Sequence, residues 1–271
     1  MDAIYIVCIF TALIHFTETA ASTMRLAGVR TKQIASSLTF VNATLLISRM
    51  SNMIQAPLLG GMVDTAILRN TPHALESQFR LVIFAAFIGN LIGAVLVPYF
   101  VFLFTKAINK FERMGSLPRV ALSAFKPRNF FLIVRNFRLP SINSFKGISL
   151  TGIPKTFLVL NVLMVSIYAI GVLSSLFAGA LIPEYRVTAT QLSGIVNGIA
   201  TILFTLLIDP TCAWITDQAV RGKRKESDVK TMVFYIVLGR VVGTLFISQL
   251  IFLPAADYIK YVTILVKGLF Q

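Results

Sequence analysis

Six long apolar segments constrain this chain more than any other feature. They span about residues 3–23, 34–56, 80–104, 156–180, 191–213 and 231–253, and a bilayer core needs about 20 mostly apolar residues per helix. The whole chain is 56% hydrophobic and 13% charged, which is too apolar for a soluble domain of 271 residues. Because a helix satisfies its own backbone hydrogen bonds in lipid, we predict an all-α membrane protein with about six transmembrane helices.

The positive charges predict how these helices are oriented. The net charge is +14, and most Lys and Arg residues lie in alternate loops, around residues 25–32, 106–155 and 221–230. The positive-inside rule places these loops in the cytoplasm and both termini outside. No soluble basic domain accompanies them, so we do not expect a nucleic-acid partner.

Two segments outside the apolar windows have an amphipathic pattern. The basic loop 106–155 contains six phenylalanines among its cations, which favours interfacial helices on anionic membrane lipids over a merely solvated loop. The tail 254–271 places Tyr258, Val262 and Leu265 on one helical face. We predict an amphipathic helix on the outer surface there.

An internal repeat relates the two halves of the chain. Residues 81–97 align without a gap to 231–247, so Gly89 and Gly93 meet Gly239 and Gly243, while Asn90 meets Arg240. Pro57 and Asp64 likewise match Pro210 and Asp217. The alternative is that glycine packing motifs recur by chance in apolar helices.

Because each repeat has three helices, an odd number, the second copy starts on the opposite side of the membrane. It is therefore inverted relative to the first, as in many secondary transporters. We therefore predict repeats at 1–105 and 156–253, joined by the loop 106–155 and followed by the tail. The second helix is expected to kink or unwind at Pro57.

Charged residues inside the apolar windows predict a binding site. Glu18, Arg49 and Arg240 each cost about 2.5–3.5 kcal/mol at mid-depth. A structural ion pair between Glu18 and Arg49 is one explanation, but a single carboxylate cannot neutralise two arginines. We expect a positively charged cavity, and guanidinium groups suit phosphate oxygens.

The remaining candidate residues surround that cavity. Arg25 and Arg30 would capture an anion at the cytoplasmic mouth, and Asn52, Gln55 and Asn90 could bind it or serve as packing contacts. His15 beside Glu18 could couple binding to protons or could be a packed histidine. The candidates for gating or proton coupling are therefore His15, Glu18, Asp64 and Asp217.

Enzymatic functions find little support. The chain has only two histidines, the spacing His15-x-x-Glu18 has no second histidine to complete a zinc site, and no Gly-rich phosphate loop appears. We therefore expect no catalytic residue, no bound metal and no cofactor.

The motifs His15–Thr19, Arg25–Gln33, Ser48–Arg49, Asn52–Met53 and Gln55–Pro57 resemble the Amj family of bacterial membrane proteins. Members of that family are alternate flippases for lipid II, the undecaprenyl-pyrophosphate-linked peptidoglycan precursor. The resemblance implies a plasma-membrane protein of cell-wall synthesis that moves lipid II from the inner to the outer leaflet by alternating access. Six helices are few for so large a headgroup, so a homodimer is plausible.

The sequence leaves two other functions open. One is transport of a smaller anion or a drug. The other is a non-catalytic membrane scaffold, in which the central charges would be paired and the basic loop would recruit partners.

Overall fold

The computed structural model describes residues 2–137, 139–141, 144, 146–149 and 152–269, apart from the side chains of Arg128 and Phe130. The regular elements in these ranges are helices. The α-helices are α1 (Ala3–Ser22), α2 (Met24–Thr31), α3 (Ile34–Leu68), α4 (Ala74–Val95), α5 (Val97–Met114), α6 (Leu117–Ala124), α7 (Pro127–Arg135), α9 (Lys155–Leu181), α10 (Arg186–Leu203), α11 (Asp209–Val220), α12 (Glu226–Val242) and α13 (Ser248–Gly268).

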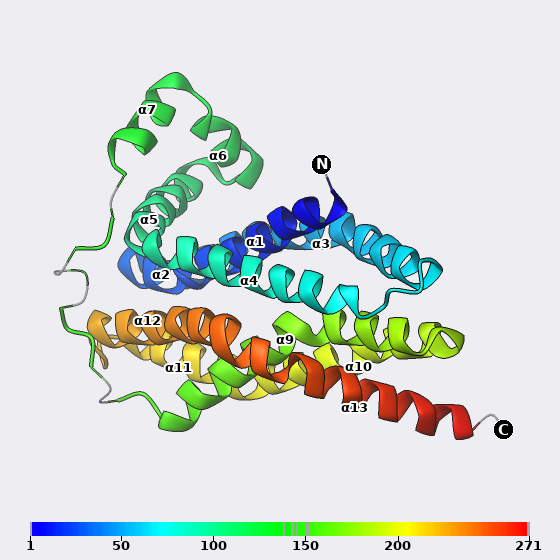
Figure 1. The fold of residues 1–271 in the computed structure, drawn as a ribbon. Coiled ribbons are helices and arrows are strands. Elements are labelled where there is room, and N and C mark those ends of the chain that lie inside the picture. The colour runs from blue at the N-terminus through cyan, green and yellow to red at the C-terminus, as the bar shows by residue number, and fades with distance from the viewer. Residues whose placement is uncertain (1, 138, 142–143, 145, 150–151, 270–271) are drawn as a thin grey trace.

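The long helices form two layers, one from each half of the chain (Figure 1). The first layer holds α1 to α4, and the second holds α9 to α13. In each layer the first helix packs against the other long helices: α1 against α3 and α4, and α9 against α10 and α13. By the colours of Figure 1, α4 runs from right to left, whereas α12 and α13 run from left to right.

An aromatic cluster packs the two layers together. Phe79 of α4 and Phe177 of α9 both contact Phe252 of α13, with ring centroids 6.4 and 5.7 Å apart. These rings belong to a buried core that also includes Val7 of α1 and Leu59 of α3. Large buried aromatic rings contribute strongly to such packing.

Five of the six expected membrane segments are confirmed by length and composition. They are Ala3–Thr31, Ala74–Val95, Lys155–Leu181, Pro183–Val220 and Glu226–Gly268. The sixth, α3, is a 35-residue helix, but Asn42, Arg49, Asn52 and Gln55 make it more polar than the rest. It nevertheless lies along α1, so its crossing of the membrane stays a prediction.

Three helix boundaries differ from our predictions. Of the two predictions for Pro57, unwinding is wrong, because α3 continues through this residue to Leu68, and a kink stays a prediction. The tail is not a helix of its own, since α13 continues through Pro254. In contrast, the predicted span 80–104 is divided at Leu96. Helix α4 ends at Val95, and α5 begins at Val97 with Pro98 in its first turn, a position where proline is favoured.

The second layer contains two π-helical segments, one near Pro210 and the other near Arg240. One, Phe204–Ile208, directly precedes Asp209 and Pro210. The other, Gly243–Ile247, begins three residues after Arg240. Such widened turns re-satisfy the backbone near a proline in a membrane helix and are frequent at functional sites.

Candidate functional site

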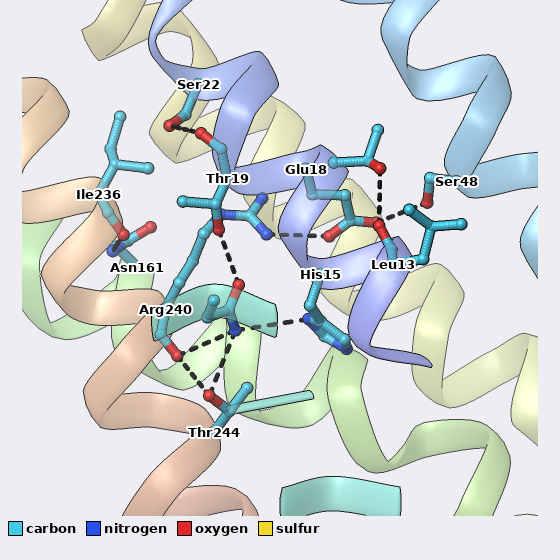
Figure 2. A network of polar contacts seen from close by, with 12 residues as sticks. Leu13, His15, Glu18, Thr19, Ser22, Ser48, Asn161, Ile236, Arg240 and Thr244 are labelled. Carbon is cyan, nitrogen blue, oxygen red and sulfur yellow. Dashed lines mark hydrogen bonds and ion pairs between the residues drawn. The ribbon is translucent and has the colours of Figure 1, made fainter. Parts of the chain in front are cut away.

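A buried ion pair joins the two layers at the centre of the molecule. Arg240 of α12 reaches across to Glu18 of α1, with Nη1 2.9 Å from Oε2 (Figure 2). The two side chains are only 14% and 12% exposed. The expected alternative, a pair between Glu18 and Arg49, is therefore wrong about the arginine, because Glu18 is already engaged by Arg240.

Hydroxyl groups support the carboxylate and its helix. Ser48 of α3 donates to the other oxygen of Glu18 at 3.3 Å. Thr17 donates to the backbone oxygen of Leu13 at 2.6 Å, which satisfies its hydroxyl within α1. The carboxylate is thus held from α12 on one side and from α3 on the other (Figure 2).

Asn90 of α4 lies at the centre of a second set of contacts. It is fully buried, and its amide nitrogen donates to the backbone oxygen of Arg240 at 3.3 Å and to Thr244 Oγ1 at 3.2 Å. The same nitrogen lies 3.5 Å from Nδ1 of His15. Thr19 donates to its amide oxygen at 2.8 Å. Asn90 therefore connects α1, α4 and α12 and is a structural contact in this state.

Arg240 keeps unused donor capacity in this network. Its Nε is buried and has no hydrogen-bond partner among the described residues. A guanidinium has five N–H donors in a fork that matches carboxylate and phosphate oxygens. A buried donor without a partner costs free energy, so an additional acceptor at this point would be favourable.

The polar stripe on α3 divides into an open part and a packed part. Arg49 and Asn52 are exposed, and Arg49 forms no ion pair with a described residue. Gln55 is buried and accepts a hydrogen bond from Thr11 at 3.1 Å. Of the three charges predicted at mid-depth, Glu18 and Arg240 therefore pair with each other, and Arg49 stays exposed.

The other predicted site residues form ion pairs away from this network. Arg25 contacts Asp209 at 2.7 Å and Arg30 contacts Glu226 at 2.7 Å. Asp64 pairs with Arg186. Asp217 pairs with Arg221 one turn along α11, at 2.9 Å.

The partners Ser48, Thr19, Thr244, Asp209, Glu226 and Arg186 were not predicted as site residues. Thr244 follows Arg240 by one helical turn, and this spacing could have indicated it. Thr19 and Ser48 are brought in by the packing of α1 against α4 and α3 within the first half. Asp209, Glu226 and Arg186 are brought in by the packing of the two halves. Among the described residues, no group of three or more His, Cys, Asp or Glu side chains could hold a metal ion.

Comparisons with known proteins find matches that cover almost the full length of the chain. The family model described as "Alternate to MurJ" (Amj) matches residues 10–263. The chain is 41% identical over 263 residues to a protein of Bacillus subtilis (strain 168) named lipid II flippase Amj, and the match covers 97% of each chain. No solved structure matches it significantly. The chain belongs to the Amj family.

Proposed function

We propose that this protein is a lipid II flippase, which moves the undecaprenyl-pyrophosphate-linked peptidoglycan precursor from the inner to the outer leaflet of the bacterial plasma membrane. The name of its 41%-identical relative supports this substrate. The single structural observation that supports the mechanism is the buried Glu18–Arg240 pair between the halves, whose arginine Nε has no hydrogen-bond partner in the part of the chain that the structure describes.

In the proposed mechanism, pyrophosphate oxygens replace Glu18 on Arg240. In the empty protein, Glu18 neutralises the buried guanidinium, which would otherwise be very costly at this depth. The incoming anion accepts hydrogen bonds from the N–H groups of Arg240, including the Nε that bonds to no described residue. Arg49, exposed on α3 beside Ser48, adds a second cation within reach of the same region. Glu18 would take up a proton or a neighbouring donor while displaced.

An inverted relationship between the halves would give this site two equivalent approaches. In the first half, a methyl group on Gly89 would lie 2.1 Å from the backbone oxygen of Ala12, so α4 packs closely on α1. In the second, a methyl group on Gly239 would lie 2.0 Å from the amide of Asn161, so α12 packs closely on α9. The aligned glycines thus play the same role in both halves.

The aligned residues Asn90 and Arg240 also touch one another, through the amide of Asn90 and the backbone oxygen of Arg240 at 3.3 Å. Two residues related by a two-fold axis can touch only close to that axis. The central network would therefore lie on the pseudo-symmetry axis, which is where transporters of inverted repeats bind their substrates.

Ion pairs between the halves would act as the gates of alternating access. Arg25–Asp209 and Arg30–Glu226 join α2 to the second half at the end that the positive-inside rule places in the cytoplasm. Asp64–Arg186 joins α3 to α10 at the opposite end. Opening one set while the other stays closed would expose the centre to one leaflet at a time.

The basic segment between the halves would rest on the cytoplasmic leaflet. Phe125 and Phe131, on or beside the short helices α6 and α7, are exposed, and Lys126 precedes α7. Exposed aromatic rings beside cations favour an anionic lipid surface. Of the other phenylalanines in this loop, Phe145 and the side chain of Phe130 lie outside the described residues.

The test of the function is made in bacterial cells whose only lipid II flippase is this protein. We expect outer-leaflet lipid II, detected by an impermeant probe, to be present when the protein is expressed and to fall to background on depletion. A normal outer-leaflet level after depletion would contradict the proposal, and movement of a small anion without lipid II would favour the alternative transporter.

A further inference from the structure

A large groove lies between the two halves and opens to the side. Its volume is about 850 Å³, and α4, α5 and α12 form its walls. Leu139, Pro140, Ser141, Ser144 and Ile148 also line it. Ligand sites in proteins have volumes of about 300–1,000 Å³. We call it the α4–α12 groove.

The groove extends along one face of α12. Lys230, Phe234, Leu238 and Val241 line it, at steps of three or four residues that put them on one side of a helix. From Lys230 to Val241 the helix rises about 16 Å. Val241 directly follows Arg240 on α12, so along the helix axis the groove extends from Lys230 to the level of the central ion pair, although Arg240 is not among the residues that line it.

Three positive side chains line the groove, Arg30, Lys106 and Lys230, and we call the part that they line its cationic end. The described residues that line the groove include no carboxylate. Glu226 contacts Arg30 through Nε only, and Lys230 donates to the backbone oxygen of Lys146 at 2.8 Å. With Glu226 counted, this end has a net charge of about +2.

The long side of the groove faces the surroundings of the protein. Leu91, Val95 and Leu238 line it and are 38%, 40% and 40% exposed. In a membrane these side chains meet lipid chains, so a molecule could enter sideways from the bilayer without leaving it.

We propose that the α4–α12 groove binds the lipid carrier of the substrate, with the pyrophosphate at Arg30, Lys106 and Lys230 and the first isoprene units along α12. This proposal rests on the proposed function and identifies where the substrate docks before it reaches Arg240. A pyrophosphate diester carries two negative charges, which match the net charge of the cationic end. A bilayer phospholipid with a single phosphodiester carries one from that group and matches it less well.

The test is direct binding of lipid II to the purified full-length protein in detergent, followed by native mass spectrometry. Lys106→Gln with Lys230→Gln should weaken lipid II binding about tenfold or more, because charge-assisted hydrogen bonds are lost. Val95→Trp should weaken it by filling the groove. Its matched control is Ile92→Trp on the same helix, since Ile92 is 48% exposed and does not line the groove.

Each outcome decides the proposal. Loss of binding in both groove variants, with Ile92→Trp unchanged and melting temperatures preserved, supports it. Equal binding of lipid II by all variants overturns it. Equal competition by phosphatidylglycerol also overturns it, because the groove would then be a site for bilayer lipid. Equal competition by inorganic pyrophosphate overturns it as well, because the isoprene chain would then have no role. If either groove variant unfolds, Lys106→Gln alone, with Lys110→Gln on the same helix as its control, decides the result.

The two proposals can fail separately. Lipid II that binds in the groove but never reaches the outer leaflet would remove the proposed function and leave the groove. Normal flipping and normal binding by the groove variants would remove the groove and leave the function.

Discussion

A buried arginine in a membrane helix requires an acceptor, and Glu18 supplies it at the cost of burying a second charge. The pair is only slightly exposed. Removing one member of a buried pair is more harmful than removing both, because it leaves the other charge uncompensated.

At the residue scale, Arg240→Gln should therefore destabilise the protein by about 3–5 kcal/mol. The double variant with Glu18→Gln should recover much of this loss. Thermal unfolding in detergent measures both. Arg221→Gln, which breaks an exposed pair on α11, is the control and should change stability by under about 1 kcal/mol. A double variant no more stable than Arg240→Gln would contradict the uncompensated-charge explanation.

Part of this site follows from the sequence and part does not. The cost of burying charge in an apolar segment indicates Glu18, Arg49 and Arg240 from the sequence alone, but it cannot choose the partner. Arg240 lies 222 residues from Glu18, and only the packing of α12 against α1 brings them together. Arg25 and Arg30 were expected as free anion-binding groups, yet acidic residues of the second half engage both.

At the element scale, close helix contacts hold each half together at its glycines. Apolar periodicity predicted the long helices well, because backbone hydrogen bonding in lipid leaves few alternatives. Prolines were weaker predictors of helix ends. Helices α3 and α13 continue through Pro57 and Pro254, as membrane helices can where their surroundings compensate for the lost hydrogen bond.

Gly89→Ala should destabilise the first half strongly. The added methyl would lie 2.1 Å from the backbone oxygen of Ala12, and backbone cannot move aside as a side-chain end can. We expect a loss of about 3 kcal/mol or more in thermal unfolding, at or above the upper end of overpacking costs. Gly198→Ala on α10 is the control, because no atom of the described residues lies within 4 Å of its added methyl. Equal stability of the two variants would rule out the close contact between α1 and α4.

At the scale of the whole molecule, alternating access requires the two halves to move against each other. In the described part of the chain, four ion pairs join them: Glu18–Arg240, Arg25–Asp209, Arg30–Glu226 and Asp64–Arg186. The three pairs outside the centre include two at one end of the molecule and one at the other. A transporter that works by alternating access must break the ion pairs at one end while those at the other end stay intact.

Cross-linking either end should therefore stop transport. In a background with the two native cysteines, Cys8 and Cys212, changed to serine, Asp64→Cys with Arg186→Cys would be joined by a short thiol-specific linker that a reducing agent cleaves. We expect loss of lipid II flipping that the reducing agent restores. The same two substitutions without linker are the control. Full flipping by the cross-linked protein would exclude alternating access at this end.

In the proposed mechanism Arg240 binds the pyrophosphate at the centre of the protein during translocation, and lipid II translocation in proteoliposomes tests this role most directly. The wild-type protein, Arg221→Gln and the double variant Glu18→Gln with Arg240→Gln would be reconstituted at equal amounts. We predict that the wild type and Arg221→Gln move lipid II to the opposite leaflet, whereas the folded double variant loses at least about tenfold in rate. A folded double variant that translocates lipid II at the wild-type rate would contradict this role of Arg240.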